Sequence, residues 1–184
     1  MMFDPIKILE KYSNSQKKAL KILLHHGRLV KNKALEIAEH FTLDKIDLKF
    51  IEEAAILHDI GIFFVNAPEI GCYGDKPYIA HGYLGREVLE KEGLPKHALA
   101  AERHTGMGIH KEEIIIKNLP LPYRDFIPIS WEEKILCYAD KFYSKNPERK
   151  YPELTLKEIE KHLREIGEEK WKLFEEWRKI FEGK

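Results

Sequence analysis

The chain has 184 residues, and its 31 lysines and arginines balance 31 aspartates and glutamates, so the formal net charge is +0. That length allows one domain with a substantial core, and the neutral charge gives no electrostatic case for nucleic acid or an anionic membrane. No apolar run reaches the length of a bilayer span, and the N-terminus lacks the apolar region of a secretory signal. Cys72 and Cys137 form no spacing motif, so we expect reduced thiols in a cytoplasmic protein.

Helical periodicity dominates the sequence from its beginning. The first predicted helix covers residues 4–12, where Asp4 is a suitable N-cap and Pro5 takes the first helical position. Apolar residues at helical spacing predict a second helix over residues 15–41, and Gly27 predicts a break within it.

The middle of the chain continues with helical segments separated by glycine and proline. Asp47 is the expected N-cap of a buried helix that ends near Gly61. The elements expected next are a Gly- and Pro-rich loop at 66–80, helices at 81–94 and 95–104, a short helix within irregular chain at 105–130, and a helix at 131–145. The run EEIIIKNL, residues 112–119, is ambiguous between strand and helix.

The last segment, residues 155–184, reads as a helix with apolar residues in a three-four repeat. Thr155 and Glu158 match a capping box at its start. Packing of this helix on its own core is one interpretation and contact in a homodimer is the other; we favour the first, because so few heptads do not establish a coiled coil. We expect one all-α domain over residues 1–184, with a core at about 15–145 and a helical extension at 155–182.

The segment EEAAILHDIGIFF, residues 52–64, places His58 and Asp59 side by side in an otherwise apolar run. Burying such groups without partners is costly, and a metal ion would offset the cost, because imidazole and carboxylate are ordinary ligands for Zn, Fe and Mn. Two ligands are too few for a site. Further ligands are expected from polar residues in apolar helical segments or at helix ends, namely His26, His81, His104 and Asp140.

A single histidine on a helix is more often a surface residue or a hydrogen-bonded core residue than a metal ligand. We assign this interpretation to four histidines: His25, His40, His97 and His162, with His97 expected at the surface. For the other positions, the occurrence of six polar residues in apolar or helix-end contexts of one helical chain favours a shared site.

Five segments in this order, HHGRLV, AAILHDIG, IAHGYLG, ERHTGMGI and ILCYADKF, resemble the HD superfamily of metal-dependent phosphohydrolases in its HDIG-type branch. The stretch from RHTGMGI to CYAD is similar to small uncharacterised HDIG proteins. The resemblance implies a helical bundle with a metal site at its centre. It also implies one or two divalent transition-metal ions as cofactors, without choosing between Fe, Mn, Zn, Ni and Co.

Carried over onto this sequence, the resemblance implies four metal ligands and an additional histidine pair found in two-metal members. The four are His26, His58, Asp59 and Asp140, and the pair is His81 and His104. Asp59 would bridge the two metals, and His58 and Asp59 would be the catalytic pair. The implied reaction is hydrolysis of a phosphate ester or anhydride of a small metabolite or nucleotide by a metal-bound hydroxide.

One departure from the family pattern concerns substrate contacts. Many HDIG-type hydrolases have a lysine three positions after the aspartate, where this chain has Ile62. Phosphate contacts are therefore expected elsewhere, from Arg103, His110 or Lys141, while Lys145 is interpreted as a solvated surface charge.

Two other functions stay open at this point. A di-iron oxygenase similar to inositol oxygenase, cleaving a C–C or C–P bond, would use the same six ligands, and a non-catalytic HD module would bind a ligand only. The expected partner is a small phosphorylated metabolite or nucleotide, with neither nucleic acid nor membrane. We also expect the loop at 66–80, which connects Asp59 to His81, to form a mobile rim over the site.

Overall fold

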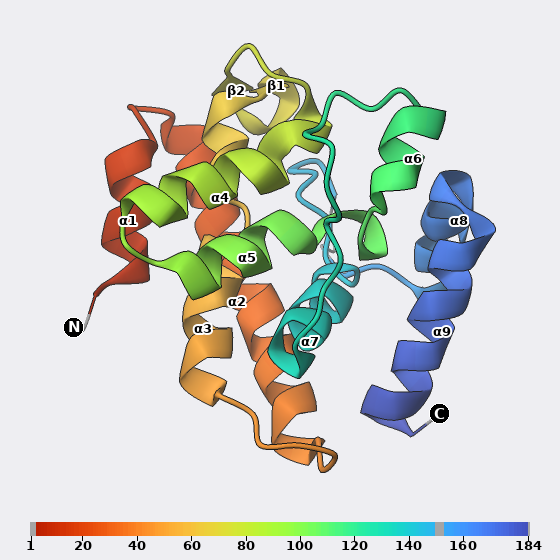
Figure 1. The fold of residues 1–184 in the computed structure, drawn as a ribbon. Coiled ribbons are helices and arrows are strands. Elements are labelled where there is room, and N and C mark those ends of the chain that lie inside the picture. The colour runs from red at the N-terminus through yellow and green to blue at the C-terminus, as the bar shows by residue number, and fades with distance from the viewer. Residues whose placement is uncertain (1–2, 150–152, 184) are drawn as a thin grey trace.

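The computed structural model describes residues 3–149 and 153–183, and helices make up most of this part of the chain (Figure 1). The expected all-α fold is confirmed. The α-helices are α1 (Pro5–Tyr12), α2 (Lys17–His40), α3 (Leu48–Leu57), α4 (His81–Lys91), α5 (Pro95–Arg103), α6 (Lys111–Ile116), α7 (Trp131–Asp140), α8 (Leu156–Ile166) and α9 (Glu168–Glu182). Short 3-10 turns join some of them: η1 (Ile60–Phe64), η2 (Pro68–Ile70), η3 (Tyr78–Ala80) and η4 (Thr105–Met107).

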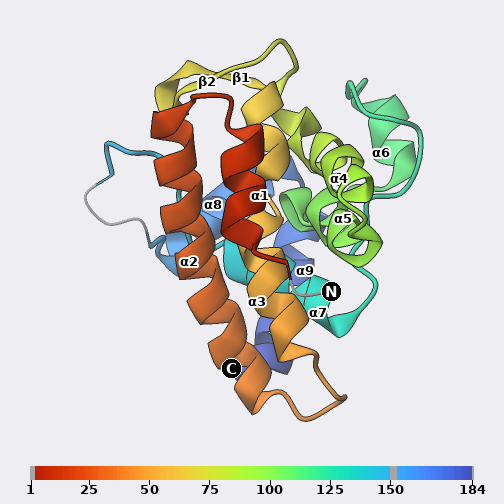
Figure 2. The same cartoon turned by 90° about the vertical axis from the view of Figure 1, so that its left-hand side faces the viewer.

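The hydrophobic core is built around α3. Helix α2 packs against α3 and α7, and α4 packs against α5 and η1 (Figure 2). One cluster of buried apolar residues joins α2, α3, α7 and α9, and a second joins α1, α2, the end of α3, η1, α4 and α5. Because α2 and α3 contribute to both clusters, the middle of α2 and the C-terminal end of α3 lie between them. None of the helices in residues 3–149 and 153–183 is long and apolar enough to cross a membrane.

The predicted break in the second helix is wrong, because α2 continues through Gly27. Gly27 is buried against α3, where an added Cβ would lie 3.0 Å from the carbonyl oxygen of Ala55 and 3.2 Å from Cα of Ile56. The glycine therefore allows two helix backbones to approach closely and does not end a helix. Its position next to His26 brings that side chain close to the end of α3.

The segment expected to be an irregular loop contains a small hairpin. Strands β1 (Asn66–Ala67) and β2 (Cys72–Tyr73) pair antiparallel, with Asn66 opposite Tyr73. Two residues per strand are too few to change the fold class. The ambiguous run at 112–119 includes helix α6 and contains no strand within its described residues.

The C-terminal segment forms two helices where one was predicted. Helices α8 and α9 are separated at Gly167 and lie side by side on the face of the molecule opposite α1 (Figure 1). The predicted capping box is confirmed, because Thr155 N–H donates to Oε2 of Glu158 at 2.8 Å and Glu158 N–H donates to Oγ1 of Thr155 at 3.3 Å. Apolar side chains of both helices are buried in the first core cluster, as the favoured interpretation expected.

Candidate metal centre

The six predicted metal ligands come from five separate parts of the chain and meet in the interior. His26 lies in the middle of α2, and His58 caps α3 with Asp59 directly after it. Each remaining ligand also lies at a helix boundary: His81 begins α4, His104 follows α5, and Asp140 ends α7. All six side chains are buried, and they form two groups of potential ligands that share Asp59.

The first group consists of His26, His58, Asp59 and Asp140. Nε2 of His26 lies 2.9 Å from Oδ1 of Asp140 and 3.4 Å from Oδ2 of Asp59. Nε2 of His58 lies 3.2 Å from Oδ2 of Asp59 and 3.4 Å from Oδ1 of Asp140. Two nitrogens and two oxygens thus face one point, which is the donor set of a transition-metal site.

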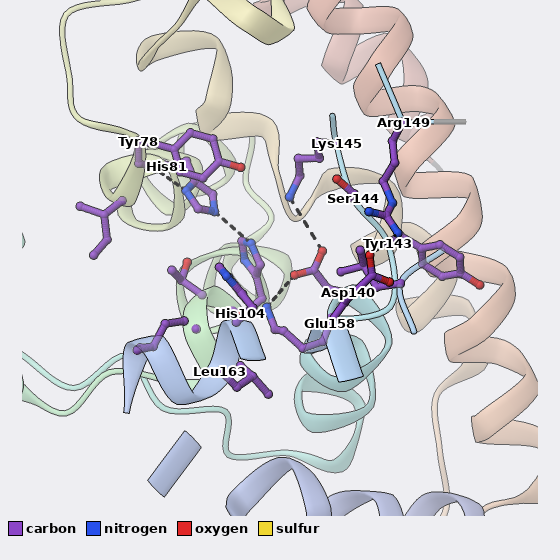
Figure 3. Close-up of a pocket in the computed structure, with 17 residues that line it drawn as sticks. Tyr78, His81, His104, Asp140, Tyr143, Ser144, Lys145, Arg149, Glu158 and Leu163 are labelled. Carbon is purple, nitrogen blue, oxygen red and sulfur yellow. Dashed lines mark hydrogen bonds and ion pairs between the residues drawn. The ribbon is translucent and has the colours of Figure 1, made fainter. Parts of the chain in front are cut away.

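The second group consists of Asp59, His81 and His104. Nε2 of His81 and Nε2 of His104 lie 3.6 Å and 3.4 Å from Oδ1 of Asp59. The two nitrogens lie 3.1 Å from each other (Figure 3). Asp59 therefore turns Oδ2 to the first group and Oδ1 to the second. This is the arrangement of a carboxylate placed between two ligand sets.

Backbone carbonyls fix the orientation of three of the histidines. Nδ1 of His58, His81 and His104 lies 2.8, 2.7 and 2.7 Å from the carbonyl oxygen three residues earlier in each case. A carbonyl only accepts, so Nδ1 carries a proton and donates it, and Nε2 has the lone pair whenever the ring is neutral. Such an outer hydrogen bond is what normally orients a metal-binding imidazole.

The residues present fit a bound cation. Within the described residues, Nε2 of His58 and Oδ1 of Asp59 are buried without a hydrogen bond, while Oδ2 of Asp59 has an ion pair with Lys145 at 2.8 Å. The lone pairs of His81 and His104 also face each other at 3.1 Å, where neither ring has a proton to donate. Buried polar atoms without partners are costly, and a cation placed among these atoms would satisfy all of them.

The electrostatics of the centre keep most ligands in the form that binds metal. Burial lowers the pKa of His26 to about 4 and that of His81 to about 3, so both imidazoles are neutral. Burial opposes a charge on His58 as well, but the carboxylates of Asp59 and Asp140 raise its pKa to about 9. Burial would raise the pKa of each carboxyl, yet His58 and nearby lysines hold both well below the usual range. Both aspartates are therefore ionised.

A pocket of about 650 Å³ opens beside the second ligand group (Figure 3). Its residues come from η3, η4, the end of α7 with the chain after it, and α8. Lys141 and Lys145 line the pocket at the metal centre: Nζ of Lys141 lies 2.7 Å from Oδ2 of Asp140, and Nζ of Lys145 lies 2.8 Å from Oδ2 of Asp59. Two ammonium groups therefore lie where the pocket borders the ligands, each paired with a ligand carboxylate.

The interpretation of Lys145 as a solvated surface charge is wrong. Its side chain is 14% exposed and is directed at the centre, because the chain turns back after α7 ends at Asp140. The sequence predicted a helix that continues to residue 145, and the prediction therefore did not include the turn that brings Lys145 back to the centre. The position that departs from the family pattern, Ile62, is buried in the second core cluster.

The three predicted substrate contacts have different environments. Lys141 lines the pocket, whereas Arg103 is paired with the carboxylate of Glu133 at 3.0 Å and is not among the lining residues. His110 is exposed at the start of α6, and its ring faces Asp125 at 3.8 Å. Lys141 is therefore the predicted contact that the fold brings to the metal centre.

The remaining histidines give two corrections. His97 is buried, not at the surface, and its Nε2 lies 3.1 Å from Oε2 of Glu53, so it is a hydrogen-bonded core residue. His25 and His40 are exposed as expected. His162 is exposed too, but it lines the pocket from α8.

The segment at 66–80 meets the site with its last residues. Tyr78 and Ile79 line the pocket, and the ring of Tyr78 lies against the ring of His81. The hairpin before them packs on α2, where Nζ of Lys18 donates to the carbonyl oxygen of Glu69 at 2.8 Å. Only the end of this segment thus borders the pocket in the described structure, and its mobility stays a prediction.

Helices that converge on a buried His and Asp cluster define a metal-binding helical domain. The model of the HD domain family matches residues 23–145, about two thirds of the chain, so this chain belongs to the HD domain family. The matched segment contains all six ligands and ends before α8.

Several curated proteins are similar to the chain. An uncharacterised protein of Methanocaldococcus jannaschii is 38% identical over 112 residues, 60% of this chain and 53% of that protein. Two proteins named tRNA (cytidine(56)-2'-O)-methyltransferase are also similar. The one from Thermoplasma volcanium is 28% identical over 89% of this chain and 42% of its own length, and the one from Picrophilus torridus is 32% identical over 67% and 32%. The chain thus spans about half or less of these relatives, and no solved structure matches it.

Proposed function

We propose that the protein is a metal-dependent phosphohydrolase that acts on a phosphate ester or anhydride of a small metabolite or nucleotide. The observation that carries the proposal is the position of Asp59, which turns one oxygen to each of two histidine-containing ligand groups beside a lysine-lined pocket. The proposal includes two metal ions, which would be held by the two ligand groups that share Asp59.

Bound divalent cations supply a water nucleophile of lowered pKa and neutralise charge on a phosphoryl oxygen. The chain contributes the geometry. Nζ of Lys141 donates both to Asp140 and to the carbonyl oxygen of His104, so it ties a ligand of the first group to the backbone that carries a ligand of the second. Lys141 is therefore a positioning residue, and it fixes the positions of the two ligand groups relative to each other.

Lys145 is better placed than Lys141 to contact substrate. Its ammonium group lies at the junction of the ligands and the pocket, where a phosphoryl group bound to the metals would be within reach. A point charge with three donors suits phosphate oxygens. Together with the cations it favours a substrate with more than one negative charge.

The relatives named as methyltransferases favour a second candidate, a non-catalytic ligand-binding HD module. Their similarity covers less than half of their own length but 89% and 67% of this chain, so in both cases it includes part of the segment that the HD family model matches here. We attribute the similarity to a shared HD segment and do not infer methyl transfer for this chain. In longer proteins such a segment could act by binding a metabolite beside another enzyme.

The absence of the family's lysine at the position of Ile62 is compatible with oxygenase chemistry as well as with hydrolysis. Ile62 is fully buried in the core, so this position offers no phosphate contact. The lysine at the centre is supplied instead by Lys145. Oxygen consumption with substrate is the measurement that separates the two chemistries.

The experiment starts from protein purified without chelator and measures metal per chain together with phosphate release from a panel of phosphate esters and nucleotides. We expect close to two metal ions per chain and phosphate release without oxygen consumption in protein reconstituted with Mn, Co, Ni, Fe or Zn. The double change His81→Ala and His104→Ala should lower metal content towards one and remove most hydrolysis, because it deletes the imidazoles of the second group.

His25, the exposed neighbour of the ligand His26, provides the control. The change His25→Ala should leave metal content and phosphate release unchanged. Substrate turnover that requires oxygen would refute the hydrolase proposal in favour of the oxygenase. Tight metabolite binding without turnover, across the whole metal series, would replace it by the binding module.

A further inference from the structure

The wall of the pocket opposite the metal centre is formed by α8, which lies beyond the matched HD segment. Glu158, His162 and Ile166 follow one another at intervals of four residues and therefore share one face of the helix. This face lines the pocket together with Leu163. Across from it, Ile79 lines the pocket from η3.

The α8 wall is firmly held on the rest of the molecule. Ile159 and Leu163 are buried in the core on the inner side of the helix, and the capping box closes its first turn. At the other end, Nζ of Lys117 donates to the carbonyl oxygen of Ile166 at 3.0 Å. A wall fixed at both ends can determine which substrates fit.

The backbone of η4 comes close to the end of this wall. Gly106 has φ of 58°, a conformation that favours glycine, and a Cβ added there would lie 4.0 Å from Cδ1 of Ile166. Gly106 and Ile166 both line the pocket. Ile166 therefore projects into the same space that the ligand His104, two residues before Gly106, borders from the other side.

The lining of the pocket is chemically mixed. The metal ligands and Lys145 suit a phosphoryl group. Apolar side chains line the pocket as well, and the whole space of about 650 Å³ is within the range of pockets that hold an organic ligand larger than phosphate. The apolar lining residues are Ile79, Leu154, Leu163 and Ile166.

We propose that the substrate is a phosphomonoester whose organic part contains a largely apolar ring, with the phosphoryl group at Lys145 and the ring against the His162 and Ile166 face of α8. This proposal rests on the proposed function and names its substrate class. An imidazole and a branched aliphatic side chain one turn apart offer a flat and an apolar contact to a ring. The specificity of the site then comes from residues outside the matched HD segment.

Two non-hydrolysable probes test the contacts to the phosphoryl group and to the ring separately. Phenylphosphonate and methylphosphonate carry the same anionic group and differ in the ring, so titration calorimetry with metal-loaded protein compares their Kd values directly. We expect phenylphosphonate to bind about tenfold more tightly, a difference within the range that apolar pocket contacts supply. Lys145→Met should weaken both probes by the same factor, with metal content measured in parallel.

The α8 variants should affect the ring alone. Ile166→Ala and His162→Ala should each reduce the preference for phenylphosphonate several-fold and leave methylphosphonate unchanged. Leu156→Ala is the matched control, because Leu156 is an exposed apolar residue of the same helix and is not among the lining residues. His162 is exposed, so its variant keeps the test valid if Ile166→Ala does not fold.

Equal affinity for the two phosphonates in the wild type would overturn the assignment of the ring subsite, as would α8 variants that weaken both probes alike. If the protein still releases phosphate from small esters in that case, the proposed function stands and only the substrate class fails. If neither phosphonate binds and no ester is hydrolysed in any metal form, the proposed function itself fails.

Discussion

Gly61 allows η1 and α4 to approach closely enough for Asp59 and His81 to reach the same metal centre. Its replacement by alanine is the sharpest test of this close approach. Gly61 lies two residues after Asp59, where η1 crosses the beginning of α4. A Cβ added to Gly61 would lie 1.9 Å from the carbonyl oxygen of His81 and 2.5 Å from the backbone nitrogen of Gly85. Both obstacles are backbone atoms, so no side-chain rotation can relieve the clash.

The size of the effect follows from these distances. Ordinary contacts begin at 3.4 Å, so the carbonyl of His81 would have to retreat by about 1.5 Å. Overpacking of a core costs about 1–3 kcal/mol and occasionally more, and the fixed backbone places Gly61→Ala at about 3 kcal/mol. In a chain of this size that corresponds to a fall in Tm of about 6–12 °C. The shift also displaces the ring of His81 from Oδ1 of Asp59, so the second ligand group is lost first.

Thermal unfolding followed by circular dichroism and metal analysis of the purified protein check this prediction. We expect Gly61→Ala to unfold earlier and to bind about one metal ion fewer per chain. Gly85→Ala is the control on the opposite side of the same contact, because its Cβ would meet its nearest neighbours at 3.4 Å or more. A Gly61→Ala protein with the Tm and metal content of the wild type would refute the packing argument.

Further changes separate the metal centre from the framework around it. Asp59→Asn should abolish tight metal binding, because a neutral amide cannot replace the shared carboxylate, whereas His97→Gln should keep the metal content measured by elemental analysis. Lys170→Met should lower stability by about 1–3 kcal/mol in chemical unfolding, because buried Nζ of Lys170 donates to the carbonyl of Gly108 and to Glu113; exposed Lys172→Met should not. A wild-type unfolding midpoint in Lys170→Met, or metal loss in His97→Gln, would contradict these expectations.

The metal ligands were predictable because their local sequence contexts are unusual. A histidine and an aspartate in a buried helical run, or at helix ends, are expensive unless something binds them, and this applies to His58, Asp59 and Asp140 without any knowledge of the fold. The resemblance to HD proteins added the order of the ligands. Neither source could give the distances, which depend on how five segments pack.

Glycine positions were the main source of error in the predicted helices. Gly27 was expected to break a helix and instead marks a close helix contact, while Gly167 separates α8 from α9 and was not identified. A local pattern does not distinguish these cases, since both glycines stand in helical sequence. What differs is the neighbour: Gly27 faces the backbone of α3, and Gly167 precedes the first turn of a new helix.

Lys145 was missed for a related reason. Its sequence context, SKNP, is typical of a solvated turn, and its role depends on α7 ending at Asp140 so that the chain can return over the centre. The contact between Lys145 and Asp59 joins residues that are far apart in sequence. Local periodicity contains no information about such a contact.

Helix ends have a chemical reason to carry the ligands of this centre. The last four carbonyls of a helix lack intrahelical partners, and His58 and His104, directly after α3 and α5, donate Nδ1–H to two of them, those of Ala55 and Ala101. The same geometry that ends the helix therefore leaves Nε2 of each ring free for a metal. His26 lies inside α2, and its buried Nδ1 finds no hydrogen-bond partner among the described residues. Its ring is held by packing and by the contact of Nε2 with Oδ1 of Asp140 at 2.9 Å, so the close approach of α2 to α3 at Gly27 is a requirement of the metal centre as well as of the fold.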